Sequence, residues 1–193
     1  MEDSQLLYHC SPVSGLRELR PSVTKYFGKP KQVCLTSSLP MALMYGAKHF
    51  EYTYGYTKDR QIYYEEYFPN ALEEIYGGKS ASLYRCTLRA DMERTKIPNE
   101  LVTHNPVPVV EEIPVPDVYQ ALLEQEKLGA LKIVRYQDMT DKRRAWVRES
   151  EAKVILEQNL LQEDNPFARY LREKYPDSWA LAQDREQERE AGR

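Results

Sequence analysis

Short apolar runs interrupted by polar residues open the chain and predict strands that end at a cleft. Residues 6–13 form an apolar run that His9, Ser11 and Pro12 interrupt. Because proline has no N–H to donate to a neighbouring strand, a strand through this run ends at Pro12. We therefore expect His9 at the terminus of a strand, where polar side chains meet a cleft.

A second apolar run is followed by the signals of a helix start. Residues 33–35 predict another strand, and residues 36–38, Thr-Ser-Ser, are of the type that caps helix N-termini. Pro40 suits the first helical turn, and residues 41–45 continue as apolar helix formers. The sequence thus predicts a strand, a hydroxyl cap and a helix in that order, with Tyr45 near the helix end.

Tyrosine is concentrated in the next stretch of the chain. Six tyrosines fall between residues 52 and 67, and Gly55 and residues 58–60 divide this stretch into two short extended segments. The pattern favours a hairpin or loop layer packed by tyrosine rings. An aromatic lid over a ligand is the alternative, because tyrosine combines a large contact area with a polar hydroxyl.

The spacing of apolar residues, together with the glycines and prolines that end helices and strands, predicts the remaining elements. In chain order they are a turn and short helix at 67–78, a strand at 81–88, an extended segment at 97–110, a helix at 117–128, a strand at 131–136, and two or three amphipathic helices within 143–162 and 166–182. Residues 183–193 are almost entirely charged or small, so we expect a frayed tail.

These elements predict an α+β domain over residues 1–137 and a helical C-terminal extension over residues 138–193. The extension either packs on the sheet or binds another protein, and the sequence leaves both open. Its basic cluster at residues 142–148 favours a solvated helix face over a phosphate site, because acidic residues flank it.

Composition narrows the classes of function. The 193 residues carry a formal net charge of −3, which gives no basic surplus to hold a nucleic-acid backbone, so a nucleic-acid binder is disfavoured.

The chain has an odd number of cysteines, and the three, Cys10, Cys34 and Cys86, are widely spaced. With no signal peptide and no apolar stretch of about 18 residues, we expect a cytoplasmic protein without a membrane segment. The three histidines show no metal-ligand spacing, so we expect no metal.

The segment Tyr8-His9-Cys10-Ser11, with the strand, hydroxyl cap and helix that follow, resembles the front half of the ADP-ribosyltransferase fold. This superfamily includes diphtheria-toxin-like, poly(ADP-ribose)-polymerase-like and rifampin-modifying transferases, and the resemblance reaches to about residue 120. It implies an α+β fold with a split antiparallel sheet and flanking helices. It also implies NAD as substrate, with transfer of ADP-ribose to an unknown acceptor or NAD glycohydrolysis.

The resemblance implies a catalytic glutamate at the start of a late strand. Glu100 is the best positional match, because it opens the extended segment at 97–110. Its carboxylate would stabilise the oxocarbenium ion that forms on the ribose. Glu111 and Glu112 are its rivals, because they end the same apolar stretch.

The resemblance also implies ligands for the rest of NAD. His9 would hold the adenosine-side ribose, and Tyr45 would stack on the nicotinamide. Thr36 or Ser37 would bond the nicotinamide carboxamide.

Two positions depart from the pattern of the family. Cys34 stands where many relatives carry an aromatic residue beside the nicotinamide, and Cys10 stands where glycine or threonine usually follows the histidine. A second hypothesis therefore stays open, in which the fold is catalytically degenerate and acts as a protein-interaction module through its C-terminal helices.

Overall fold

The computed structural model describes residues 6–22 and 31–192, which form two compact units. The first unit comprises the described residues up to Tyr64 and the segment Leu72–Ile133, and the second comprises Glu65–Ala71 and the chain from Val134 onward. Helices and a mostly antiparallel sheet are both present, which confirms the predicted α+β class. The segment Glu65–Ala71, which we expected in the first domain, clusters with the C-terminal helices instead.

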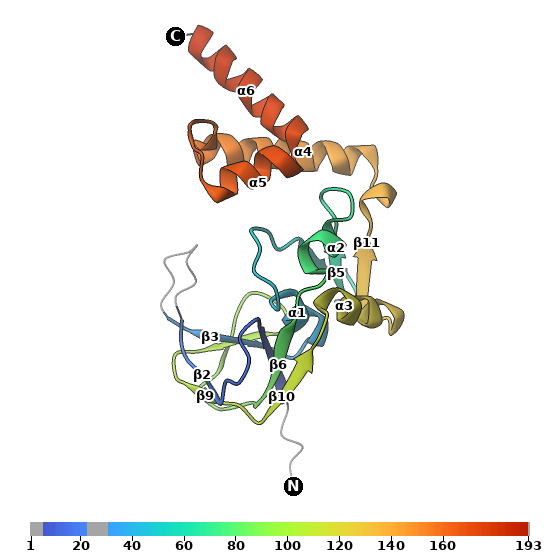
Figure 1. The fold of residues 1–193 in the computed structure, drawn as a ribbon, viewed down its shortest axis with the longest axis vertical. Helices are drawn as coiled ribbons and strands as arrows, with labels where there is room; N and C mark the ends of the chain where they lie inside the picture. The colour runs from blue at the N-terminus through green and yellow to red at the C-terminus, as the bar shows by residue number, and fades with distance from the viewer. Residues whose placement is uncertain (1–5, 23–30, 193) are drawn as a thin grey trace. The chain divides into compact units, whose positions relative to one another are not determined.

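The first unit is built on a six-stranded sheet in the order β10-β6-β1-β3-β8-β7, whose pairings are antiparallel (Figure 1). In chain order its strands are β1 (Leu6–Ser11), β3 (Val33–Thr36), β6 (Ala81–Thr87), β7 (Glu93–Arg94), β8 (Glu100–Thr103) and β10 (Glu111–Val115). Two smaller sheets contain β4 (Tyr54–Tyr56) with β5 (Ile62–Glu65) and β11 (Leu131–Val134), and β2 (Glu18–Leu19) with β9 (Val107–Pro108).

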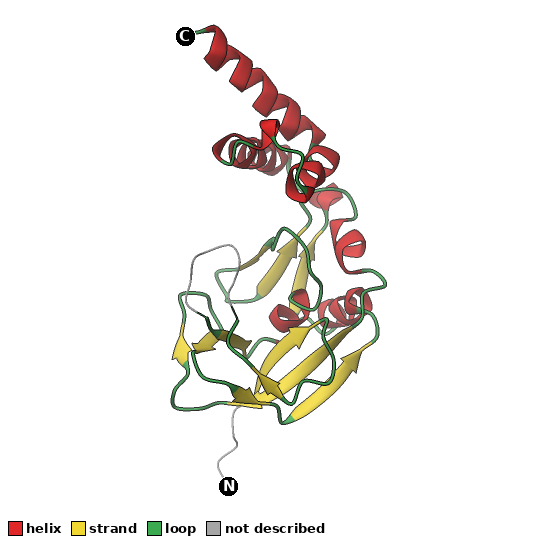
Figure 2. Ribbon diagram, turned by 60° about the vertical axis from the view of Figure 1, so that its left-hand side comes forward, coloured by secondary structure: helices red, strands yellow, loops and turns green. Residues whose placement is uncertain are grey.

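Alternate side chains of β1 pack into two different apolar layers. Cys10 packs in a layer with α1 (Leu39–Met44), α2 (Ala71–Tyr76) and α3 (Val118–Lys127), and Figure 2 shows helices lying against the sheet. Leu7 packs in the other layer with Tyr84 and with residues of β2 and β9. Because successive side chains of a strand point to opposite faces, helices cover one face of the sheet and short strands and loops cover the other.

The first helices begin and end where the sequence predicts. Ser38 caps α1 by accepting a hydrogen bond from the Met41 N–H at 3.4 Å, and Asp117 caps α3 by accepting one from the Gln120 N–H at 3.1 Å. After α3 the chain turns at Gly129, whose φ of +73° suits glycine. These caps fix where the helices attach to the strands.

The second unit consists mainly of three helices, α4 (Asp141–Glu157), α5 (Pro166–Lys174) and α6 (Pro176–Ala191), with short 3-10 turns η1 (Tyr136–Asp138) and η2 (Leu160–Gln162). Its buried side chains include Val147, Ile155, Leu171 and Trp179. The expected frayed tail is helical to Ala191, because long unbranched side chains have high helix propensity and Arg185 pairs with Glu149 of α4 at 2.7 Å. Arg193 lies outside the described residues.

A largely buried ion pair ties Glu65 to the helical unit. Glu65 is 7% exposed and accepts two hydrogen bonds from Arg143, at 2.9 Å from Nε and 2.6 Å from Nη2. The Arg143 guanidinium also lies over the ring of Trp146, 3.9 Å from its centroid, in a cation–π contact. Arg143, a member of the predicted basic cluster, therefore has a structural role.

Replacing Arg143 with alanine is expected to destabilise the helical unit by roughly 2–3 kcal/mol, because the Glu65 carboxylate loses its charged partner. Both tryptophans of the chain, Trp146 and Trp179, lie in this unit, so tryptophan fluorescence during urea denaturation measures the loss. The control variant Lys142→Ala, at an exposed position, should unfold at the wild-type urea concentration. Wild-type stability in Arg143→Ala would contradict this structural role.

Candidate functional site

Glu100, the first residue of β8, lies in a row of side chains that crosses three strands. It stands opposite Thr36 of β3, and Thr36 stands opposite Tyr8 of β1. Directly opposed residues of an antiparallel sheet share one face, and Tyr8 packs against the layer that contains α1 and α3. Glu100 therefore belongs to the helix-covered face of the sheet, at the ends of two strands.

One oxygen of the Glu100 carboxylate is held and the other is open. The Thr95 hydroxyl donates a hydrogen bond to Oε2 at 2.6 Å, whereas no donor among residues 6–22 and 31–192 bonds Oε1. The residue is only partly buried. A carboxylate in this state can accept a hydrogen bond from a ligand hydroxyl or stabilise a nearby positive charge.

Tyr45, Tyr52, Tyr54 and Tyr56 form an aromatic group on the same face, here named the tyrosine cluster. Burial raises the pKa of Tyr45, Tyr54 and Tyr56, and the nearby negative charge of Glu100 raises each pKa further. These three hydroxyls therefore stay protonated at neutral pH and can donate hydrogen bonds. The Tyr56 hydroxyl donates a hydrogen bond to the Pro98 carbonyl at 2.8 Å, which places the cluster beside the start of β8.

The ring of Tyr45, at the end of α1, contacts two other rings of the cluster. Tyr52 stacks on it, with centroids 4.6 Å apart and planes at 25°. Tyr54 meets it edge-on, with centroids 6.3 Å apart and hydroxyl oxygens 3.0 Å apart. Tyr52 therefore covers one face of the Tyr45 ring.

Thr36 and Ser37, the two predicted carboxamide ligands, differ in how their hydroxyls are used. Thr36 is 5% exposed, and its hydroxyl accepts a bond from the Ser38 N–H at 3.0 Å and donates one to the Met41 sulfur at 3.4 Å. The Ser37 hydroxyl lies nearer the surface, 3.5 Å from Oδ1 of Asn99. Thr36 therefore holds the start of α1, and the Ser37 hydroxyl is the more accessible of the two.

His9 is on the opposite face of the sheet from Glu100. It follows Tyr8 in β1, so its side chain points away from the helix-covered face. Its ring lies 6.5 Å from the ring of Tyr84, the residue opposite it on β6. The structure thus brings Tyr45 and Glu100 together, but it does not add His9 to that group.

The His9 ring instead joins two strands. The register between β1 and β3 is a single residue pair, Tyr8 with Thr36, and Nδ1 of His9 lies 3.0 Å from the backbone carbonyl oxygen of Cys34. Burial lowers the pKa of His9 more than this hydrogen bond raises it, so the ring is neutral at pH 7. Because a carbonyl only accepts, Nδ1 carries the hydrogen and Nε2 is left as an acceptor.

The rival carboxylates, Glu111 and Glu112, are both engaged. Glu112 accepts hydrogen bonds from the Gly15 N–H at 2.9 Å and from the hydroxyls of Ser82 at 2.6 Å and Tyr84 at 3.3 Å. Glu111 forms an ion pair with Arg85 at 2.7 Å. Glu112 thus fastens the loop after β1 to the sheet with both of its oxygens, and Glu111 pairs with an arginine, whereas no cation among the described residues pairs with Glu100.

The buried cysteines are poor nucleophiles. Burial raises the pKa of Cys10 to about 12 and that of Cys86 to about 11, so both stay as thiols at neutral pH. Over the part of the chain that the structure describes, no group of three or more His, Cys, Asp or Glu side chains is placed to hold a metal ion. The groups beside the strand ends that can act chemically include the Glu100 carboxylate and the neighbouring hydroxyls.

Sequence reasoning missed Asn99, which joins the two strands that carry the site. Its carbonyl accepts a hydrogen bond from the Ser37 N–H at 3.0 Å, and its φ is +65°. Asparagine adopts this left-handed conformation more readily than most residues do. The Pro-Asn order before Glu100 is a turn signal that could have located this residue.

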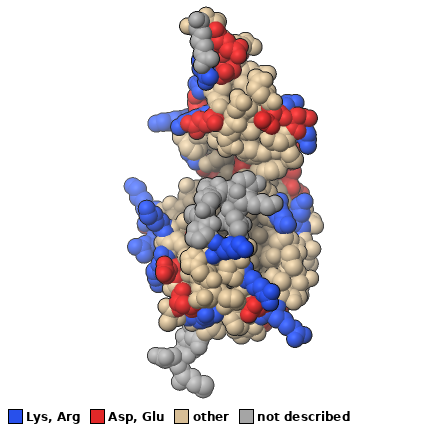
Figure 3. All heavy atoms as spheres, turned by 90° about the vertical axis from the view of Figure 1, so that its left-hand side faces the viewer, with Lys and Arg blue, Asp and Glu red and all other residues tan. Residues whose placement is uncertain are grey.

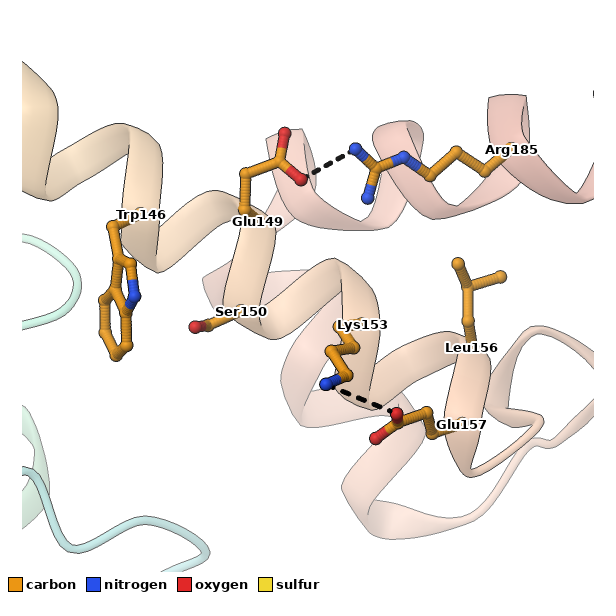
Figure 4. Close-up of a pocket in the computed structure, with 7 residues that line it drawn as sticks. All are labelled: Trp146, Glu149, Ser150, Lys153, Leu156, Glu157 and Arg185. Atoms are coloured by element: carbon orange, nitrogen blue, oxygen red, sulfur yellow. Dashed lines mark hydrogen bonds and ion pairs between the residues drawn. The ribbon is translucent and has the colours of Figure 1, made fainter.

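A groove on the helical unit lies between α4 and α6 and has a volume of about 520 Å³ (Figure 4). Trp146 lines it, together with two ion pairs, Glu149 with Arg185 at 2.7 Å and Lys153 with Glu157 at 3.5 Å. Positive and negative side chains intermingle on the face of this unit in Figure 3. Because the charges of the groove pair with one another, it lacks the free charged group that marks the Glu100 site.

Comparisons of the chain with protein-family models, with curated proteins and with solved structures found no match. Within residues 6–22 and 31–192, no helix has the length and apolar character needed to cross a membrane.

We expect the chain to lose stability as the pH falls below about 6.5, the ordinary pKa of histidine. The pKa of His9 is lower in the folded than in the unfolded chain, so the unfolded chain binds more protons in this range and is favoured. One such group changes the free energy of unfolding by at most about 1.4 kcal/mol per pH unit.

Urea denaturation at about pH 7.5 and about pH 5 tests this dependence. His9→Gln should weaken it, whereas the control His104→Gln, at an exposed position, should preserve the wild-type dependence. An unchanged pH dependence in His9→Gln would contradict the assignment of His9 as a buried neutral ring.

Replacing Glu112 with alanine should lower the melting temperature of the protein by several degrees, because the Gly15 N–H and the Ser82 hydroxyl lose their acceptor. Thermal denaturation followed by circular dichroism measures the change. The control Glu111→Ala removes only an exposed ion pair with Arg85 and should melt close to wild type. Equal melting temperatures for the two variants would show that Glu112 does not fasten the loop.

Proposed function

We propose that this chain cleaves the nicotinamide–ribose bond of NAD and transfers ADP-ribose to an acceptor, with Glu100 as the catalytic carboxylate. The observation that carries the proposal is the state of this carboxylate. One oxygen is held by Thr95 at 2.6 Å and the other is open, on the face that also bears the tyrosine cluster. Both oxygens of Glu112 accept hydrogen bonds, and Glu111 lies at the surface in an ion pair with Arg85.

The reaction needs an anion fixed beside the ribose. When nicotinamide leaves, it takes the electron pair of the C1′–N bond, and positive charge develops on C1′ and the ring oxygen of the ribose. A carboxylate held in place before the reaction stabilises that charge without having to reorganise. The hydrogen bond from Thr95 orients Glu100, and its open oxygen can accept a hydrogen bond from a ribose hydroxyl.

Tyr45 supplies the surface for the nicotinamide ring. A stacked aromatic pair contributes on the order of 1 kcal/mol beyond the burial of area. The face of Tyr45 that Tyr52 covers must open before a ligand ring can stack there, so Tyr52 moves when NAD binds. Ser37, whose hydroxyl lies nearer the surface than that of Thr36, is the hydroxyl ligand for the carboxamide.

In this mechanism His9 holds two strands together and does not contact the ribose. Its Nδ1–H donates to the carbonyl of Cys34, next to the single pair that joins β1 to β3. We assign it as a positioning residue, in place of the ribose contact implied by the resemblance. It keeps β3, and therefore α1 with Tyr45 at its end, at a fixed distance from β1.

The proposal includes the ADP-ribosyltransferase-like fold. Support comes from the separation of the strands into a six-stranded and a three-stranded sheet, with helices packed on one face of the larger sheet. Further support comes from the order along the chain of His9, the hydroxyl cap, Tyr45 and Glu100.

The second candidate function is a protein-interaction module built on the C-terminal helices. The observation that favours it is Trp146, whose large apolar side chain is 47% exposed on α4. Absence of any NAD binding by the wild-type chain would favour this function over the enzymatic one.

Replacing Glu100 with glutamine should lower the rate of nicotinamide release from NAD by about 100-fold or more, because the amide cannot stabilise the ribose cation through a charge. Release is followed by chromatography, and the affinity for NAD is measured by calorimetry. Affinity should change little, since glutamine preserves the shape of the side chain. The control Glu93→Gln, at an exposed position on β7, should keep the wild-type rate, and wild-type turnover in Glu100→Gln would refute the mechanism.

A further inference from the structure

The groove between α4 and α6 is lined by a pattern of α4 residues that is symmetric about residue 151. Trp146 lies five positions before this residue and Leu156 five positions after it, and both line the groove (Figure 4). Glu149 lies two positions before residue 151 and Lys153 two positions after it, and they line the same groove. Apolar side chains thus stand at both ends of the pattern, with opposite charges on either side of its centre. We name these four residues the α4 stripe.

The α4 stripe has the spacing of a helix–helix contact. Its members follow one another at intervals of three, four and three residues, which keeps them on one side of an α-helix. The residues that α4 buries within its own unit, Val147, Ala152 and Ile155, are not among them. The stripe is therefore available to a partner.

Trp146 is held in place although its side chain is 47% exposed. The Arg143 guanidinium lies over its ring, 3.9 Å from the centroid, and the ring of Tyr67 meets it edge-on at 6.2 Å. Because these contacts already fix the ring, a partner that packs on it pays little for ordering the side chain. Tryptophans of this kind are common at the centres of protein contacts.

A second copy of α4 in antiparallel orientation matches the stripe residue by residue. Two antiparallel helices bring residues to the same level when their numbers add up to a constant. With residue 151 on a twofold axis, Trp146 of each copy lies level with Leu156 of the other, and Glu149 lies level with Lys153. Each contact occurs twice, as it does in any twofold dimer. A parallel arrangement would instead place each charge against its like, so the charges favour the antiparallel one.

The ion pairs within the chain leave room for these contacts. Glu149 pairs with Arg185 of α6 at 2.7 Å, and Lys153 pairs with Glu157 at 3.5 Å. The four side chains are 41–70% exposed. A carboxylate accepts several hydrogen bonds and an ammonium group donates three, so each stripe charge can gain a partner in the other copy and keep its own. Formation of the contact would leave none of these charges buried and unpaired.

We propose that the groove between α4 and α6 is the contact surface of a homodimer, in which two α4 helices pack antiparallel and Trp146 of each copy contacts Leu156 of the other. The inference does not depend on the cleavage of NAD proposed above, because every residue that carries it lies in the helical unit. It gives the C-terminal helices a partner of defined chemistry, a second copy of this chain.

Sedimentation equilibrium of the full chain over a concentration series tests the dimer. The wild-type chain should reach twice the mass of one chain as its concentration rises. Glu149→Lys and Lys153→Glu should each dimerise at least about tenfold more weakly, because like charges then face each other twice across the contact. An equimolar mixture of these two variants should regain the dimer, since a mixed pair places lysine opposite glutamate at both levels.

Two further variants separate the contact from general effects of charge and folding. Trp146→Ala should also dimerise at least about tenfold more weakly, because the contact loses its largest apolar side chain. Arg148→Glu reverses an exposed charge of α4 outside the groove lining and should dimerise as the wild-type chain does. Circular dichroism should show the same helix content in all of these variants.

A wild-type chain that keeps the mass of one chain at every concentration would overturn the proposal and leave the groove to a different protein. Undiminished dimerisation of Glu149→Lys or Trp146→Ala would place the contact elsewhere and would also overturn it. Failure of the mixed variants to regain the dimer would overturn the antiparallel pairing.

Discussion

The contact between β1 and β3 is the narrow link that joins the two halves of the large sheet, β10-β6-β1 and β3-β8-β7. Its register consists of one residue pair, Tyr8 with Thr36, and the imidazole of His9 adds a hydrogen bond to the Cys34 carbonyl. Beyond this link, β3 leads directly into α1 and pairs with β8 along four residue pairs. The aromatic rings at the end of α1 and the carboxylate at the start of β8 are therefore positioned through the same short strand. A shift of β3 relative to β1 would move both together.

Local features of the fold could be predicted because their causes lie within a few residues. The hydroxyl of Ser38 caps α1, the carboxylate of Asp117 caps α3, and Gly129 turns the chain after it. These signals act between neighbours in the sequence, so they are visible without a structure. The tail was harder to predict, because a charged composition fits both a frayed end and an exposed helix.

The face of the sheet on which a residue lies, and its contacts with residues far away in the sequence, could not be predicted in the same way. His9 and Glu100 were assigned to one site, yet a difference of one position in β1 places His9 on the opposite face. The choice between Glu100 and Glu112 depended on Gly15, whose N–H bonds Glu112 across a separation of 97 residues. The attachment of Glu65 to the helical unit likewise depends on Arg143, 78 residues away. Pairings over such distances leave no local pattern in the sequence.

The stack of Tyr52 on Tyr45 weakens the binding of any ligand ring that needs the covered face of Tyr45. Tyr52 also contacts the ring of His49, with centroids 4.1 Å apart, so a ligand that displaces Tyr52 breaks two ring contacts. Each aromatic pair is worth about 0.5–1.5 kcal/mol beyond area burial, and the affinity of such a ligand falls by the corresponding factor. Until it is displaced, Tyr52 keeps this face of the Tyr45 ring out of water. The chain thus shields an apolar surface and binds a stacking ring less tightly as a result.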